Sequence, residues 1–298
     1  MNTPKLKIVF IDVGWGDSIL IDATDASGES HFALIDCNDS TNSLSGRNFL
    51  KRYFERLGRW PGGYRVFTYV FTTHAHNDHV SGVQGVLRAF GTDFLYSSRC
   101  NKGPSHAFSN LIRWARRATR MHNKVANTVG YLNSSSKPLP LAGASISVLW
   151  PPDRGTAPYD STNENNNSLV LQIEIGDVIF VLTGDCEATN FDTATSDHVK
   201  LPTKDLQMIQ VPHHGARNSI FDGPGRTSSF LDQILLPRSV PIPYFAISCH
   251  KRPHGHPHPD VIAELAHRGV ACPFRTDEHW NLVFSTDGAT VTVEYTHA

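Results

Sequence analysis

Short apolar runs rich in β-branched and aromatic residues recur along most of the chain, and polar segments with glycine, proline or asparagine separate them. Such runs are typical of β-strands. Gly176 and Asp177 stand between two of the runs and predict a hairpin turn. We expect strands at residues 6–13, 18–22, 31–37, 66–72, 94–97, 145–150, 168–175, 178–183, 206–211, 244–248, 282–285 and 290–295.

Fewer segments have helical patterning. Pro259 suits the first turn of the last expected helix, and Gly269 suits its end. Residues 133–140 and 151–167 have the composition of loops. We expect helices at residues 47–57, 83–90, 107–125, about 228–236 and 259–268, and therefore an α/β fold.

The N-terminal strands are more apolar than alternating, which is typical of sheets whose faces are covered by helices. Neither predicted loop looks like a domain boundary, because strands needed for one system of sheets lie on both sides of each loop. A chain of 298 residues can bury one large core or two small ones. We expect residues 1–298 to form a single domain.

Composition narrows the class of protein only slightly. The chain is 40% hydrophobic and 18% charged with a net charge of −1, so no global charge indicates a nucleic-acid or membrane partner. Five scattered cysteines argue against a disulfide framework and for a reducing compartment. The first residues read as a strand rather than a signal peptide, and no apolar run is long enough to span a bilayer. We expect a cytoplasmic protein with no membrane contact.

The most informative string is FTTHAHNDHVSG at residues 71–82, directly after an expected strand. It carries four potential metal ligands, His74, His76, Asp78 and His79. Imidazole and carboxylate suit Zn²⁺ and related divalent ions. Burying four such side chains together is unfavourable without a partner, and a cation is the natural partner. The plainer alternative is a polar loop with chance histidines, in a chain that has 16 of them.

Three later strands also lead into histidine or aspartate. Asp185 follows one of them, His213 and His214 follow the next, and His256 lies in the loop after the third. Strand ends that meet on one rim are how a rigid scaffold assembles a precise site. Each signal alone is weak, because an aspartate after a glycine is commonly a turn residue. His213 is also consistent with a surface histidine.

Residues 108–124 read FSNLIRWARRATRMHNK and contain a local stripe of positive charge. Its cations lie at helical spacing and therefore share one face of the expected helix. Such a stripe can follow a phosphate backbone. A solvated helix face is the equally consistent alternative. The candidates for substrate binding are Arg113, Arg117 and Arg120.

Several strings together resemble a known family. FTTHAHNDHVSG resembles the HxHxDH signature of the metallo-β-lactamase superfamily. Further strings resemble the hydrolase domain of ComEC-type competence proteins, with Trp15 where glutamine is usual, over roughly residues 6–296. In chain order these strings are FIDVGWGDSILI, ALIDCN, NNNSLVLQIEIGDVIFVLTGDCE, VPHHGARNS, GHPHPDVIAEL and RTDEHWNLVFSTDG.

The resemblance implies a four-layer αββα sandwich of the metallo-β-lactamase fold, with a metal site at one edge of the paired sheets. It also implies two divalent metal ions. The residues that it assigns are His74 and His76 for the first ion, Asp78, His79 and His214 for the second, Asp185 as the bridge between them, and Asp36 as the residue that orients the histidine rings.

The sequence departs from this pattern in one place. Members with two full sites carry another histidine shortly before the strand expected at residues 168–175, where this chain has NENNN at residues 163–167. Glu164, an asparagine oxygen or water can take that place. We therefore expect the site of His74 and His76 to be weaker or more selective. Because oxygen ligands favour Mn²⁺, that ion is an alternative to Zn²⁺.

The ligand set and the resemblance imply a hydrolase of phosphodiester bonds, foremost a nuclease acting on DNA or RNA. Two cations can clamp an oxyanion and lower the pKa of a bound water to about 7. Asp78 and Asp185 are the candidate catalytic carboxylates, and Asp185 can also hold or receive the proton of this water. His213 and His256 can donate to a phosphate oxygen or protonate the leaving oxygen. The alternatives are a small-molecule phosphodiesterase or esterase of the phosphocholine-ester type, and a catalytically weak metal-binding sensor module.

Overall fold

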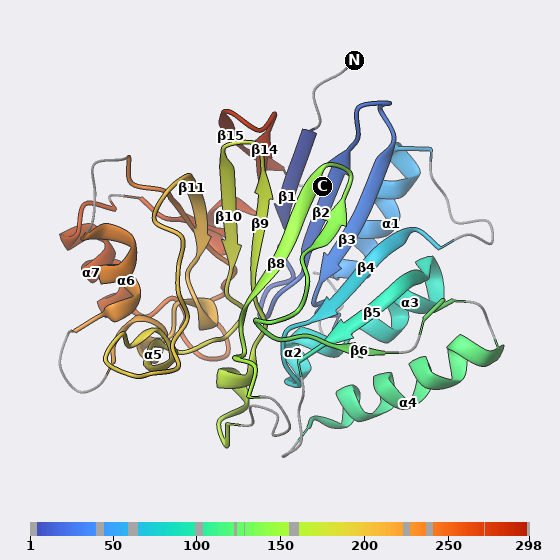
Figure 1. The fold of residues 1–298 in the computed structure, drawn as a ribbon, viewed down its shortest axis with the longest axis horizontal. Helices are drawn as coiled ribbons and strands as arrows, with labels where there is room; N and C mark the ends of the chain where they lie inside the picture. The colour runs from blue at the N-terminus through green and yellow to red at the C-terminus, as the bar shows by residue number, and fades with distance from the viewer. Residues whose placement is uncertain are drawn as a thin grey trace.

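Two β-sheets lie face to face, and helices cover the outer face of each (Figure 1). The computed structural model describes residues 5–39, 45–58, 65–98, 104–121, 124–127, 129–154, 161–222, 227–236, 241–270 and 272–296. The expectation of a four-layer αββα sandwich is confirmed by this arrangement.

The first sheet contains strands from both ends of the chain. Its strands are β1 (Lys5–Phe10), β2 (Ile19–Thr24), β3 (Ser30–Ile35), β4 (Phe67–Thr72), β5 (Thr92–Ser97), β6 (Gly130–Tyr131), β14 (Asn281–Thr286) and β15 (Val291–Thr296). Their order across the sheet is β15–β14–β1–β2–β3–β4–β5–β6. Since β14 pairs with β1, the C-terminal strands complete a sheet that the N-terminal strands begin.

The second sheet comes from the middle of the chain. Its strands are β7 (Leu139–Leu141), β8 (Ala144–Trp150), β9 (Val170–Ile175), β10 (Val178–Leu182), β11 (Leu206–Gln210), β12 (Tyr244–Ile247) and β13 (Phe274–Arg275). Their order is β13–β12–β11–β10–β9–β8–β7. The predicted hairpin is confirmed, because Ile175 pairs with Val178 across the two-residue turn between β9 and β10.

The longer helices divide between the two outer faces. They are α1 (Gly46–Arg56), α2 (Asn77–Val80), α3 (Val83–Phe90), α4 (His106–Met121), α5 (Arg217–Ile220), α6 (Ser229–Leu235), α7 (Pro259–His267) and α8 (Thr276–His279). Helices α1, α3 and α4 cover the first sheet, and α6 and α7 cover the second (Figure 1). Among the described residues, no helix is long and apolar enough to cross a membrane.

The alternation of side chains explains the layers. In β1, Leu6, Ile8 and Phe10 point between the sheets, while Val9 points to the helices of the first outer face. Both environments are apolar, which is why the sequence shows near-continuous apolar runs here. The two sheets are therefore held together by one buried layer, and each sheet is held to its helices by another.

The expected strands are all present within a few residues, but three short ones were not predicted. β6 and β13 have two residues each, and β7 lies inside the segment 133–140 that was predicted as a loop. These strands form only because a longer neighbour offers a free edge, so their sequences carry little signal of their own. The expected helix at 107–125 ends at Met121, since Lys124 and Ala126 bond to Thr92 at the start of β5.

Candidate metal centre

Four strands end at the same edge of the sandwich and deliver the candidate ligands there. Asp36 follows β3, His74 follows β4, Asp185 follows β10 and His214 follows β11. β3 and β4 are parallel, as are β10 and β11, so each pair ends at one edge of its sheet. The sequence expectation of a rim built from strand ends is confirmed.

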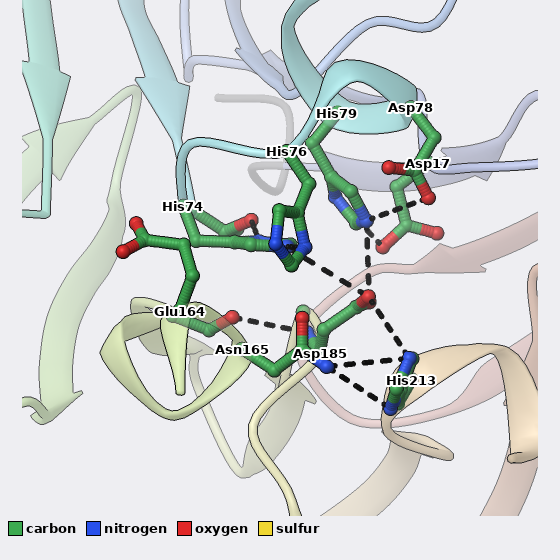
Figure 2. A network of polar contacts seen from close by, with 12 residues as sticks. Asp17, His74, His76, Asp78, His79, Glu164, Asn165, Asp185 and His213 are labelled. Atoms are coloured by element: carbon green, nitrogen blue, oxygen red, sulfur yellow. Dashed lines mark hydrogen bonds and ion pairs between the residues drawn. The ribbon is translucent and has the colours of Figure 1, made fainter. Parts of the chain in front are cut away.

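The structure gathers Asp78, His79, Asp185 and His214 into one buried group that can hold a metal ion, with ligand atoms within 4.8 Å of one another. Asp185 Oδ1 lies 3.2 Å from His79 Nε2 and 3.4 Å from His214 Nε2. Asp78 Oδ2 lies 3.4 Å from His214 Nε2. Figure 2 shows Asp185 between the histidines of the HAHNDH segment and His213.

The chemistry of these atoms fits a cation. Nε2 of His79, Nε2 of His214 and Oδ1 of Asp185 are buried and have no hydrogen-bond partner among the described residues. Unsatisfied buried polar atoms are unfavourable, and three of them facing one another are better explained by a shared ligand. Two imidazoles and two carboxylates are a suitable donor set for Zn²⁺ or Mn²⁺.

Hydrogen bonds on the far side of the rings select which nitrogen faces the centre. His79 Nδ1 donates to Asp36 Oδ2 at 2.7 Å, and His214 Nδ1 donates to the Ser248 carbonyl at 2.9 Å. A carboxylate and a carbonyl can only accept, so the proton must be on Nδ1. Nε2 of both rings is therefore available for a cation.

His74 is oriented in the same way through Thr73. The Thr73 hydroxyl donates to Asp36 Oδ2 at 2.6 Å, so it accepts from His74 Nδ1 at 3.1 Å. His74 Nε2 then lies 3.0 Å from His76 Nδ1 and 3.8 Å from Asp185 Oδ2. His74, His76 and Asp185 thus lie together as expected. The more compact group is the one around His79 and His214.

The structure distinguishes between the residues that could replace the missing histidine. The Glu164 carboxylate accepts hydrogen bonds from the Ala75 amide at 3.2 Å and from Asn167 at 3.1 Å, which occupy both of its oxygens. Asn165 instead points into the site (Figure 2). Its Nδ2 donates to Glu187 at 2.9 Å, and its buried Oδ1 has no hydrogen-bond partner among the described residues.

Charges around the centre shift the pKa values of its members strongly. Burial lowers the pKa of His79 and His214, but the nearby carboxylates outweigh burial, raising the pKa of His79 well above its usual range and that of His214 to about 9. Burial raises the pKa of Asp185, but the charges of His214 and His79 hold it well below its usual range. Protons therefore balance the buried carboxylates when no cation is bound, and a cation would displace them.

Asp17 belongs to this site and was not singled out from the sequence. Its carboxylate is 1% exposed and lies 3.9 Å from His79 Nδ1 and 3.8 Å from His214 Nδ1. Gln210 donates to it at 2.9 Å. Asp17 thus lies behind two candidate ligand rings at once. Its only sequence signal was its place in the GDS string after the first strand.

Gly16, just before Asp17, allows this turn to approach the ligand segment closely. Its φ is +99°, and a Cβ at this position would lie 2.1 Å from the carbonyl oxygen of Asp78. The Asp17 amide donates to the same carbonyl at 3.3 Å. Only glycine fits here without moving Asp78.

A pocket of about 700 Å³ opens over the centre. His213 and His256 both line it, with their rings 6.0 Å apart. His213 Nε2 lies 3.7 Å from Asp185 Oδ2, and its Nδ1 lies 3.6 Å from Glu187. Burial, and then the charge of His214, lower the pKa of His256 to about 4. Both histidines are therefore within the pocket, as expected for residues that move protons.

The rim of this pocket includes two further histidines. His254 and His258 both line the pocket, where His254 packs against Trp15 at 4.8 Å between ring centroids. Phe108 is buried against Ala75 and packs under the metal loop. Cys186 beside Asp185 is fully buried and burial raises its pKa, so it is no nucleophile.

The basic stripe lies on α4, beside the metal centre rather than in it. Arg113 and Arg117 are exposed on its outer face, while Leu111 is buried beneath the helix. Arg120 belongs to the last turn of α4, and its side chain lies outside the described residues. The predicted face of cations is present, and its substrate-binding role stays a prediction.

Comparison with solved structures identifies the fold. The chain aligns with the metallo-β-lactamase fold protein YhfI from Bacillus subtilis over 94% of its own length and 100% of that chain, at 11% identity and a TM-score of 0.54. This likeness shows that the chain has the metallo-β-lactamase fold, as the sequence predicted. At 11% identity it shows the fold alone.

Other similarities are weaker. A motif mutant of a metallo-β-lactamase from Cronobacter sakazakii aligns over 59% of this chain and 60% of its own, at 16% identity and a TM-score of 0.35. A mutant of the CmlA β-hydroxylase aligns over 93% of this chain and 53% of its own, at 12% identity and a TM-score of 0.47. No protein-family model and no curated protein matches the sequence.

Proposed function

We propose that this chain is a metal-dependent hydrolase that cleaves phosphodiester bonds in nucleic acid. One observation supports the assignment as a hydrolase. Buried atoms of His79, Asp185 and His214 that have no hydrogen-bond partner among the described residues converge beneath an open pocket. A buried group of this kind under a solvent-accessible pocket can hold a catalytic ion and admit a substrate to it.

Two groups of residues would each hold one divalent cation. Bound divalent cations would polarise a phosphoryl oxygen and activate a water for attack. Zn²⁺ suits the imidazole-rich group, and Mn²⁺ becomes competitive where oxygen ligands replace nitrogen. One ion would be held by Asp78, His79, Asp185 and His214, and the other by His74, His76, Asp185 and the Asn165 oxygen.

The chain's own histidines would handle protons and phosphate oxygens. His213 lies between Asp185 and Glu187, so its ring is held at the wall of the pocket. His256 is neutral at pH 7 because its pKa is lowered, and its Nδ1 is buried without a partner among the described residues. A neutral imidazole can accept a proton through one nitrogen and donate through the other. We assign proton transfer to these two residues.

The nucleic-acid part of the proposal is supported by α4. Arg113, Arg116 and Arg117 are exposed cations in a chain of net charge −1, on a helix whose N-terminal neighbour Ser105 lines the metal pocket. Cations along a path to the pocket favour a polyanion over a small uncharged ester. A cytoplasmic setting is part of the proposal, and the four free cysteines of the described residues support it.

The test compares several substrates with one variant and one control. Protein loaded with Zn²⁺ or Mn²⁺ is assayed on bis-p-nitrophenyl phosphate, single- and double-stranded DNA, RNA and a phosphocholine ester. Asp185→Asn removes the shared carboxylate charge and should lower kcat/KM at least about 100-fold, or ~3 kcal/mol of barrier. Asp205→Asn, remote from the site at a positive φ that asparagine tolerates, should leave it unchanged.

Three other outcomes would contradict the proposed function in different ways. Near-normal turnover by Asp185→Asn on every substrate would refute the assignment of the metal centre. Hydrolysis of the phosphocholine ester without cleavage of any nucleic acid would replace the nuclease by a small-molecule esterase. Metal binding without turnover of any substrate would favour a sensor module.

A further inference from the structure

A second pocket, of about 540 Å³, is formed by α4 and β6 and is separate from the pocket over the metal centre. Its walls are of two kinds. Arg113, Arg116 and Arg117 supply positive charge, and Ile112 and Tyr131 supply apolar and aromatic surface. We call it the α4–β6 pocket. A hollow with both kinds of wall suits a ligand that has both an anionic and an aromatic part.

The three arginines have no acidic partner within the described part of the chain. Arg113 Nη1 lies 3.3 Å from the side-chain oxygen of Asn110, an uncharged partner. No carboxylate of the described residues lies within ion-pair distance of Arg116 or Arg117, although elsewhere Arg65, for example, pairs with Asp93 at 2.5 Å. Three adjacent cations with no counter-charge among the described residues attract an anion.

Tyr131 lines the same pocket as these cations. Its side chain is 43% exposed on β6, an edge strand of the first sheet. Gly130 lets the strand lie directly on Tyr96, because a Cβ there would meet the Tyr96 ring at 2.6 Å. An exposed aromatic ring next to arginines is the arrangement on which unpaired bases stack.

The α4–β6 pocket is next to the metal pocket along the chain. Pro104 lines the α4–β6 pocket and its neighbour Ser105 lines the metal pocket, so the two pockets share this segment as part of their walls. Along the axis of α4, at ~1.5 Å per residue, Arg113 and Arg117 lie about 12 and 18 Å beyond Ser105. At ~3.4 Å per nucleotide of a stacked strand, several phosphates cover this distance.

We propose that the α4–β6 pocket is a subsite for single-stranded nucleic acid, in which the arginines hold consecutive phosphates and Tyr131 stacks an unpaired base. A duplex cannot use Tyr131, because its bases are stacked on one another and paired. That the bound strand continues to the metal centre rests on the proposed function. The binding itself does not, so it can be tested without catalysis.

The experiment measures binding of fluorescein-labelled oligonucleotides by anisotropy to the full chain in EDTA. The probes are thymidylates of about 2 and 12 nucleotides, the corresponding oligouridylate, and a duplex of about 12 base pairs. The variants are Arg113→Gln/Arg116→Gln/Arg117→Gln, Tyr131→Ala and Tyr131→Phe. The matched control is Arg52→Gln/Arg56→Gln, which removes exposed cations from α1 on the same outer face.

The wild type should bind the single strand of about 12 nucleotides, and the dinucleotide and duplex at least about tenfold more weakly. The triple variant should raise Kd at least about tenfold and lower the slope of log Kd against log salt by ~0.7 for each phosphate that is no longer neutralised by an arginine. Tyr131→Ala should raise Kd about tenfold, or ~1.4 kcal/mol, whereas Tyr131→Phe should bind like the wild type.

Several results would overturn the proposal. The proposal is wrong if the longer single strand does not bind, or if the duplex binds as tightly as that strand. It is also wrong if the α1 control weakens binding as much as the triple variant does, or if Tyr131→Ala binds like the wild type while its circular dichroism is unchanged. Preference between the thymidylate and uridylate probes would tell DNA from RNA as the ligand. If no phosphodiester is cleaved but these binding results hold, the subsite stands while the proposed function fails.

Discussion

The Asp36 carboxylate accepts a hydrogen bond from His79 Nδ1 at 2.7 Å, and this contact turns His79 Nε2 toward Asp185. Asp36 is itself fixed by Thr73, whose amide and hydroxyl donate to it at 2.7 and 2.6 Å. Carboxylates that hold a ligand imidazole in this way set its orientation and increase its basicity. One buried carboxylate therefore prepares a neighbouring ring for a cation that it does not itself contact.

Asp36→Asn should weaken metal binding. The amide keeps the shape, but its NH₂ would face N–H and O–H donors and could no longer accept from all of them. We expect the Kd for Zn²⁺, measured by competition with a chelating dye, to rise about 10- to 100-fold. Asp22→Asn is the control, because Asp22 is also buried and accepts from Tyr53 at 2.5 Å away from the site. An equal change in both variants would mean a general loss of folding.

Gly16→Ala should disturb the ligand segment, because the new Cβ would overlap the Asp78 carbonyl. Gly28→Ala is a matched control, since Gly28 has a similar φ of +89° but no atom within 4 Å of the added Cβ. Gly28→Ala should cost about 1–2 kcal/mol in the free energy of unfolding and leave Zn²⁺ affinity unchanged. Gly16→Ala should cost more and weaken Zn²⁺ binding. Equal effects of the two changes in urea unfolding and in Zn²⁺ titration would contradict this prediction.

The stability of the metal-free protein should be greatest near pH 6.5. The pKa of His214 is raised to about 9, so its contribution is complete below the unfolded value and is lost as the pH rises toward 9. His79 acts in the same direction. This loss amounts to at most roughly 3 kcal/mol for His214. The pKa of His256 is lowered to about 4, so the unfolded chain binds its proton first and stability falls as the pH drops from about 6.5 to 4.

Urea unfolding in EDTA between about pH 5 and pH 9 checks this profile. His256→Gln should flatten the acidic limb and leave the alkaline limb intact. With saturating Zn²⁺ the alkaline limb should disappear, because the cation replaces the protons that rising pH removes. A metal-free protein that becomes steadily more stable from pH 6.5 to 9 would show that the carboxylates do not hold His79 and His214 protonated.

Asn165→His should strengthen the weaker metal position. A nitrogen ligand would replace the amide oxygen that we assign to the ion of His74 and His76, and imidazole binds Zn²⁺ more tightly than a neutral amide does. We expect the zinc content, measured by elemental analysis after dialysis against limiting Zn²⁺, to rise from about one toward two ions per chain. The zinc content of Asn165→Ala should stay near one ion per chain. If the histidine variant gains no metal and folds normally, Asn165 does not contact that position.

The local sequence pattern indicates the strands, their covering by helices and the first ligands, while the four-layer arrangement follows only from the family resemblance. The near-continuous apolar run of β1 records burial on both faces of the strand, because successive side chains of a strand point to opposite faces. His74, Asp78 and His79 are recognisable because they lie within six positions on one short segment. Such features can be read from the sequence because they depend only on residues that lie close together in the chain.

Only the packing of the two sheets brings together the distant groups that complete the site. Asp17 lies behind His79 and His214 only because β1, β4 and β11 end at one edge of the sandwich, and Gln210, 193 positions away, fixes its carboxylate. Asn165 rather than Glu164 faces the centre because the Ala75 amide binds Glu164. These choices depend on contacts between segments far apart in the chain. Such contacts are set by the packing of the two sheets, and that packing leaves no local pattern in the sequence.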